Sequence, residues 1–328
     1  MCTPKLLTLG FIVAFFAASS SGGLARDTGL IFVSSERAAG VLVIDPETHG
    51  IVKYLKTSRG PRDMHFNADH SKLYVACADD DAIDIVDVAK LEVTGRLPTA
   101  AGATTFGIDD KHHRIYVPNR EGSSLSVVDT DQNLIIHEVP TGAEPEGVLV
   151  SEDGHFVYVA AEIGDLIHLV DADGGYVAQS VTVGTGPRRL AATSDGKELW
   201  VSAELSGEVD IIDLAEFIVV GRIEFMPPGA RKLDVTPTDL VITKDGKTAY
   251  VALDHAGQVA SVDVQTRRVR GYIPVGGRAS GLAMANDART LYVADHFGDA
   301  ISIVDLTTNR VIASIPIGRR ASGLAVDD

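Results

Sequence analysis

Leu199-Trp200-Val201-Ser202 is one of seven short segments of this 328-residue chain in which an aromatic residue is followed by valine. The aromatic positions are Phe32, Tyr74, Tyr116, Tyr158, Trp200, Tyr250 and Tyr292. Successive positions lie 42, 42, 42, 42, 50 and 42 residues apart. A second marker, an aspartate that closes a Val-Ile-Asp-like run, keeps the same spacing at Asp45, Asp87, Asp129, Asp171, Asp213, Asp263 and Asp305. Two markers in phase establish an internal repeat of about 42 residues.

Each repeat contains four short apolar runs separated by turn residues, and we name the expected strands A to D in chain order. In the fifth repeat they are 188–193, 198–203, 208–212 and 218–223. The aromatic residue of strand B is expected to be buried between repeats, and the aspartate that ends strand C to form a turn with its own backbone. Four short strands in a repeat of roughly 40–45 residues are typical of a β-propeller blade.

The two ends of the chain predict how the ring closes. Residues 321–327 match strand A but have no strand B after them, whereas residues 30–34 match strand B but have no strand A before them. Pairing the two completes one blade from both termini and removes two exposed sheet edges. The sequence therefore predicts an all-β, seven-bladed propeller with four-stranded blades.

Residues 1–25 have the composition of a cleaved signal peptide. Lys5 precedes an apolar stretch, residues 6–18, and small residues occupy 23–25. We expect export across the inner membrane, to the periplasm in a Gram-negative cell, and a single propeller domain over residues 26–328. After cleavage no membrane span is expected, and the net charge of −16 argues against nucleic acid as a partner.

The loops that join strand D to the next strand A carry more bases than acids, although acids outnumber bases 45 to 29 in the whole chain. The candidate ligand-binding residues are Arg59, Arg62, Arg188, Arg278, Arg319 and Arg320. The B–C loops emerge on the same face, are acidic and are expected farther from the axis. This pattern predicts a basic funnel inside an acidic rim, suited to a carboxylate or phosphate ligand. The alternative is that the arginines pair with the rim acids and bind nothing.

An eight-residue excess in the fifth interval falls in one D–A loop. It includes Phe225, Met226, Arg231 and Lys232, which we interpret as a candidate partner-binding loop. A tolerated insertion is the alternative.

The histidines show no metal-binding spacing. Asp254-His255 and Asp295-His296 occupy neighbouring B–C loops, so His255 and His296 are the candidates for a metal ligand or a general base. No Cys-x-x-Cys-His motif is present, which excludes covalent haem attachment by that motif.

The aromatic-Val and Val-Ile-Asp markers resemble the YVTN family of β-propellers, although the family's asparagine is present only at Asn119. Residues 194–204 and 243–253 resemble more closely the secreted propellers associated with pyrroloquinoline quinone (PQQ)-dependent alcohol catabolism. That resemblance implies an accessory or binding protein exported alongside a quinoprotein dehydrogenase or cytochrome. It brings no established catalytic residues and no known cofactor.

Two functional hypotheses follow. The first is a non-catalytic binding protein that engages an anionic small molecule or a partner protein through the basic face. The second is a lactonase-like propeller hydrolase that uses a metal or a histidine base. The sequence favours the first, because no clear set of catalytic side chains lines up on strand A.

Overall fold

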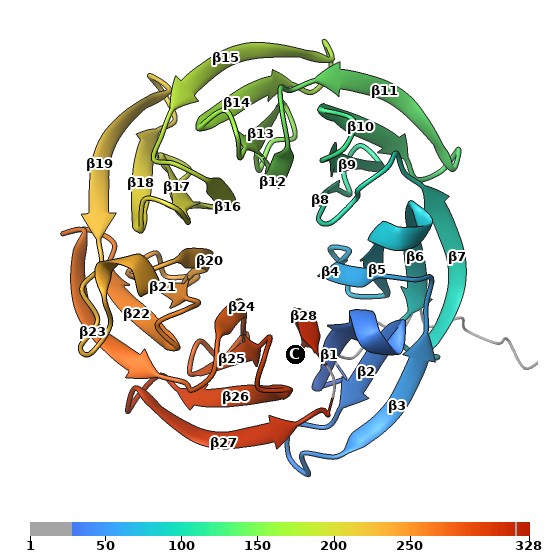
Figure 1. Ribbon diagram of the computed structural model, residues 1–328. Coiled ribbons are helices and arrows are strands. Elements are labelled where there is room, and N and C mark those ends of the chain that lie inside the picture. Colours follow the sequence, from blue (N-terminus) through green and yellow to red (C-terminus); the bar gives the residue numbers. More distant parts are fainter. Residues whose placement is uncertain (1–27, 319) are drawn as a thin grey trace, which may run out of the picture.

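Seven four-stranded antiparallel sheets form a closed ring around a central channel in the computed structural model, which describes residues 28–318 and 320–328 (Figure 1). The expected all-β, seven-bladed propeller is confirmed. The expected signal peptide, residues 1–25, and the candidate Arg319 lie outside the described residues. Within those residues, no helix is both long and apolar enough to cross a bilayer.

The blades follow the chain in order around the ring, with the innermost strand of each named first. Blade one contains β28 (Ala321–Asp327), β1 (Leu30–Ser35), β2 (Gly40–Ile44) and β3 (Ile51–Lys56). Blade two contains β4 (Pro61–Phe66), β5 (Lys72–Cys77), β6 (Ala82–Asp87) and β7 (Glu92–Pro98). Blade three contains β8 (Gly107–Asp109), β9 (Arg114–Asn119), β10 (Ser124–Asp129) and β11 (Leu134–Pro140). Blade four contains β12 (Pro145–Val150), β13 (Phe156–Ala161), β14 (Leu166–Asp171) and β15 (Tyr176–Thr182). Blade five contains β16 (Pro187–Ala192), β17 (Glu198–Ala203), β18 (Glu208–Asp213) and β19 (Ile218–Glu224). Blade six contains β20 (Pro237–Ile242), β21 (Thr248–Leu253), β22 (Gln258–Asp263) and β23 (Arg268–Pro274). Blade seven contains β24 (Ala279–Met284), β25 (Thr290–Asp295), β26 (Ala300–Asp305) and β27 (Arg310–Pro316). Between residues 28 and 318, three single-turn 3-10 helices lie in loops, η1 (Glu36–Ala38), η2 (Ala78–Asp80) and η3 (Lys232–Asp234).

The aspartates that end strand C form the expected turns. In Asp213, for example, Oδ1 accepts hydrogen bonds from the backbone N–H groups of Ala215 and Glu216, at 2.9 and 3.0 Å. At Asp263 the N–H of Thr266 and the guanidinium of Arg270 lower the pKa of the carboxyl to about 2. These aspartates therefore stabilise the turns in their charged form.

The aromatic residues of strand B pack between blades, as the repeat predicts. Trp200 is fully buried among Val209 of its own blade and Leu240 and Val251 of the next. Its indole N–H donates to Glu198 Oε2 at 3.0 Å, and Glu198 also pairs with Arg267. Cys77, also on strand B, is a buried free thiol whose pKa burial raises to about 12.

The ring closes where β28 pairs with β1 in antiparallel register, Ile31 opposite Val326 and Phe32 opposite Ala325. One carboxylate reinforces this junction. Asp327 is 1 % exposed, and its Oδ2 accepts hydrogen bonds from the backbone N–H and the hydroxyl of Thr28, at 2.8 and 2.6 Å. Its Oδ1 lies 2.9 Å from His70 Nδ1 on blade two. Asp327 therefore links three segments: the last strand, the start of the first, and the neighbouring blade.

Deleting residues 322–328 should abolish cooperative unfolding, because it removes the innermost strand of blade one and leaves β1 as an unpaired edge. Thermal unfolding and light scattering would measure this. Asp327→Ala keeps the strand and should cost about 1–3 kcal/mol, as expected when buried donors lose their acceptor. A truncated chain that melts like the wild type would contradict the closure.

Trp200→Ala should lower the free energy of unfolding by about 3–5 kcal/mol, because it leaves a cavity between blades five and six. Trp200→Tyr places there the residue that most other blades have and should cost far less. Denaturant titration followed by circular dichroism would measure both variants. An alanine variant as stable as the wild type would show that this position does not hold the blades together.

Candidate functional site

The second residue of each innermost strand, or its equivalent in blade three, lines one end of the central channel. These residues are Arg62, Thr104, Glu146, Arg188, Thr238, Ser280 and Ser322. They surround a cavity of about 250 Å³, which we call the mouth. The face that carries it, the mouth face, is built from the D–A and B–C loops.

The acidic residues of the B–C loops lie beside the arginines, not farther out as the sequence analysis expected. Glu36, Glu204 and Asp254 also line the mouth. Antiparallel pairing places the start of strand A beside the end of strand B, as Pro187 of β16 lies opposite Ala203 of β17. Arg188 there pairs with Glu204 of its own blade, whereas Arg62 and Arg278 pair with Glu36 and Asp254 of the preceding blade. Contacts within a blade and between neighbouring blades thus bring the two charge sets together.

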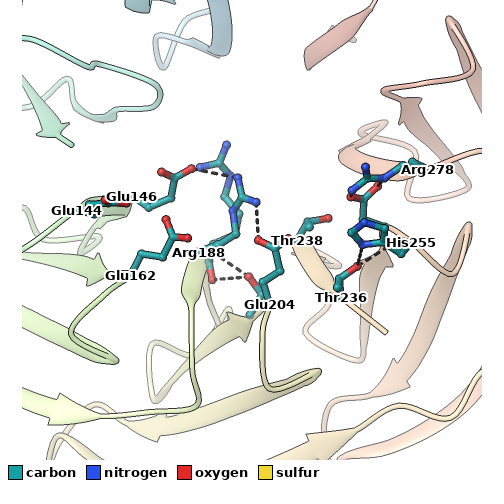
Figure 2. Close-up of polar contacts among 12 residues, drawn as sticks. Glu144, Glu146, Glu162, Arg188, Glu204, Thr236, Thr238, His255 and Arg278 are labelled. Carbon is teal, nitrogen blue, oxygen red and sulfur yellow. Dashed lines mark hydrogen bonds and ion pairs between the residues drawn. The ribbon is translucent and has the colours of Figure 1, made fainter. Parts of the chain in front are cut away.

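Arg188 lies between two carboxylates (Figure 2). Its guanidinium donates to Glu204 Oε2 at 2.6 Å and to Glu146 Oε1 at 3.1 Å. Burial alone would lower the pKa of Arg188, but Glu146 and Glu204 raise it above its usual value. Burial likewise opposes ionisation of Glu146, yet Arg188 and its neighbours hold the pKa of that carboxyl below its usual value. Both groups are therefore charged at neutral pH.

Two more candidate arginines at the mouth have a carboxylate partner. Arg278 Nε donates to Asp254 Oδ1 at 3.0 Å, and Arg62 lies 3.4 Å from Glu36. Arg59 does not line the mouth. Its side chain is 72 % exposed and pairs with Asp80.

Arg320 differs from the other arginines of the mouth. Its Nε donates to His296 Nε2, and its guanidinium lies 5.3 Å from the centre of the Phe297 ring. Arg278 lies 4.6 Å from the centre of the same ring. Among the described residues, no carboxylate forms an ion pair with Arg320. The sequence analysis named Arg320 but missed Phe297, because an aromatic residue in a single loop leaves no repeat signal.

The two candidate histidines have hydrogen-bond partners on their Nδ1 atoms. His296 Nδ1 lies 2.9 Å from the carbonyl oxygen of Ala321, which requires a proton on Nδ1 and leaves Nε2 to accept from Arg320. His255 Nδ1 lies 2.9 Å from the hydroxyl of Thr236 (Figure 2). Over residues 28–318 and 320–328, no three His, Cys, Asp or Glu side chains are grouped to hold a metal ion.

Apolar side chains project from the loops of the mouth face. Among the described residues, five of the six most exposed large hydrophobic side chains belong to its B–C and D–A loops. They are Leu233 (88 % exposed), Met226 (74 %), Leu205 (69 %), Ile163 (63 %) and Phe297 (60 %). We call these five residues the apolar tips.

The long D–A loop contributes two of the apolar tips, Met226 and Leu233. Phe225 of the candidate partner loop is only 2 % exposed and packs in the core between blades five and six, so it does not form part of the surface. Arg231 is exposed and pairs with Asp234 at 2.8 Å, and Lys232 is exposed beside it.

Beyond the mouth, the channel holds a second cavity of about 330 Å³, which we call the inner cavity. His65 lines it, and its Nε2 lies 3.2 Å from Asp63 Oδ2. Although burial opposes both shifts, Asp63 raises the pKa of His65, and His65 with Arg189 lowers the pKa of Asp63. The His65 side chain is 47 % exposed, so solvent reaches this pair.

Solved structures with the same fold have diverse descriptions. Hydrazine synthase of Kuenenia stuttgartiensis is 22 % identical, with a TM-score of 0.74 over 82 % of this chain and 90 % of that chain. A functionally unknown protein from Desulfotomaculum acetoxidans is 13 % identical, with a TM-score of 0.77 over 91 % and 99 %. The dihydro-heme d1 dehydrogenase NirN, in complex with DHE, is 16 % identical, with a TM-score of 0.67 over 89 % and 64 %. At these identities the similarity shows the fold alone.

Two family models match the sequence. One, described as a lactonase, 7-bladed beta-propeller, matches residues 174–315. The other, described as a YNCE-like beta-propeller, matches residues 13–193. No curated protein sequence matches the chain. Because the second model covers more than half of the sequence, this chain belongs to the YNCE-like β-propellers.

Proposed function

We propose that this chain is an exported, non-catalytic binding protein that docks a partner protein on its mouth face. The observation that supports this proposal best is the gathering of the apolar tips on one face of the ring. Apolar side chains exposed together on a soluble protein are typical of surfaces that another protein covers. Leucine, methionine and phenylalanine on separate loops would each insert into a pocket of the partner, and the charged mouth would form the polar centre.

The charges of the mouth suit docking. Because Glu36, Glu146, Glu204 and Asp254 neutralise most of the arginines, the loops are held in place before a partner arrives. Arg320 keeps a guanidinium free of carboxylates, next to the exposed ring of Phe297. An acidic side chain of the partner would find its counter-charge there.

The identity of the partner is proposed from the sequence. The resemblance of residues 194–204 and 243–253 to propellers of PQQ-dependent alcohol catabolism favours a quinoprotein dehydrogenase or a cytochrome. The expected signal peptide would bring the chain to the periplasm, the compartment expected for such enzymes. A free anionic small molecule such as PQQ is the other candidate for the mouth.

Leu205→Asp combined with Leu233→Asp should weaken partner binding at least tenfold, because each change places a charge where the interface would be apolar. The matched control is Ile312→Asp, which changes an equally exposed apolar residue (64 %) on β27, away from the mouth face. Biolayer interferometry against the quinoprotein dehydrogenase and the c-type cytochrome of the same cells would measure binding. Equal affinity of the double variant and the control would contradict docking on this face, and binding of free PQQ alone would favour the small-molecule alternative.

A lactonase-like hydrolase is the second candidate function. The lactonase model matches residues 174–315, and the His65–Asp63 pair in the inner cavity is the arrangement of a general base. The proposed binding function predicts that the protein does not hydrolyse five- and six-membered lactones. Titration in a pH-stat would measure hydrolysis across a panel of them. Turnover that disappears in His65→Ala, while the variant keeps the wild-type melting temperature, would favour the hydrolase instead.

A further inference from the structure

We propose that the inner cavity is a second binding site, separate from the mouth, for a small monocarboxylate with an apolar tail whose carboxylate group binds Arg189. The inference goes beyond partner docking, because it concerns the interior of the ring and needs no residue of the apolar tips.

The guanidinium of Arg189, on β16, makes no hydrogen bond among the described residues. Its side chain is 30 % exposed, but its NH1 atom is buried and has no acceptor there. Its NH2 atom lies 3.9 Å from Asp63 Oδ2, which is too far for a hydrogen bond. A buried donor atom without an acceptor is costly, because it has lost its water without gaining a partner. An anion that enters the channel would supply the missing acceptor.

The position of Arg189 makes it accessible to a ligand in the channel. Strand β16 belongs to blade five and β4, which carries Asp63, belongs to blade two, so the two strands face each other across the central opening (Figure 1). Because Arg189 NH2 comes within 3.9 Å of Asp63 Oδ2, these two side chains together span the channel. Arg189 and Asp63 line both cavities, and they form the boundary between the mouth and the inner cavity.

The other charged groups around Arg189 leave room for one negative charge when Asp239 is protonated. Asp63 is already engaged, because His65 Nε2 lies 3.2 Å from it and Thr105 donates its hydroxyl to it. Asp239 accepts hydrogen bonds from the backbone N–H groups of Leu282 and Leu240, at 2.8 and 2.9 Å, and none from Arg189. Burial raises the pKa of Asp239 to about 6. Below pH 6, where Asp239 is protonated and His65 is charged, Arg189, His65 and Asp63 sum to one positive charge, whereas ionised Asp239 at higher pH brings the sum to zero.

The wall of the inner cavity beyond Arg189 and Asp63 is apolar. Leu149, Val241, Leu282, Ala283 and Leu324 line the inner cavity on the side away from the mouth. A ligand with a charged head and a short hydrocarbon tail matches this division, because its head would reach Arg189 and its tail would displace water from the apolar wall. A dicarboxylate would place its second charge against that wall and is excluded on desolvation grounds.

Calorimetric titration of the full-length mature protein with butanoate, hexanoate, butan-1-amine and succinate would test the proposal. We expect butanoate to bind, hexanoate to bind more tightly, and the amine and succinate not to bind. Arg189→Gln should lower the affinity for butanoate at least tenfold. Arg189→Lys keeps the charge but cannot donate two parallel hydrogen bonds to the carboxylate, so it should lower the affinity less. Arg59→Gln is the matched control, because Arg59 is an exposed arginine outside the channel.

The dependence on pH provides a second readout. As the pH rises from 5 to 8, Asp239 passes its pKa of about 6 and gains a negative charge near Arg189 and Asp63. This change disfavours an anion, so butanoate should bind more tightly at pH 5 than at pH 8. Equal affinity in wild type and Arg189→Gln, or no binding of any monocarboxylate at pH 5, would overturn the proposal. Arg320→Gln should leave butanoate binding unchanged, so failure of partner docking and failure of this site are distinguishable.

Discussion

The pairing of β28 with β1 is the constraint on which the rest of the structure depends. Each blade alone is a four-stranded sheet with two apolar faces, and only the closed ring covers both faces of every blade. Closure also creates the channel, because the innermost strands point their second and third residues at a common axis only when all seven are in place. Arg62, Arg188 and Arg189 thus line one cavity in a ring that the two ends of the chain close.

Close approach of neighbouring innermost strands is part of the same geometry. A Cβ atom on Gly147 would lie 1.8 Å from the carbonyl oxygen of Arg188, and one on Gly323 would lie 2.2 Å from that of Arg62. Any side chain at these positions would push the adjacent strand away from the axis. Glycine therefore allows the backbones that carry the channel arginines to pack closely.

The charges of the mouth show how a net charge of −16 can coexist with several partly buried arginines at one site. An acid of a B–C loop pairs with an arginine at the start of strand A, in its own blade for Glu204 and Arg188 and in the next blade for Glu36 with Arg62 and Asp254 with Arg278. Two guanidinium groups differ, since Arg320 has a histidine and an aromatic ring for partners and Arg189 has an unused donor. The two proposals rest on these exceptions, because a group that the fold leaves unsatisfied is one that a ligand or partner can satisfy.

The sequence by itself determined the repeat, the seven blades, the strand bounds within about one residue, the buried Trp200 and the closing pair of strands, because each is a local pattern of apolar and turn residues repeated in phase. It also identified Arg62, Arg188, Arg278 and Arg320, which lie at fixed positions in the repeat. Only the tertiary structure decided their partners, the burial of Phe225 and the exposure of Leu233. The approach of Arg189 to within 3.9 Å of Asp63 could not be predicted either, because the two residues come from blades on opposite sides of the ring. Contacts across the channel depend on the radius and closure of the whole ring, and no local pattern encodes them.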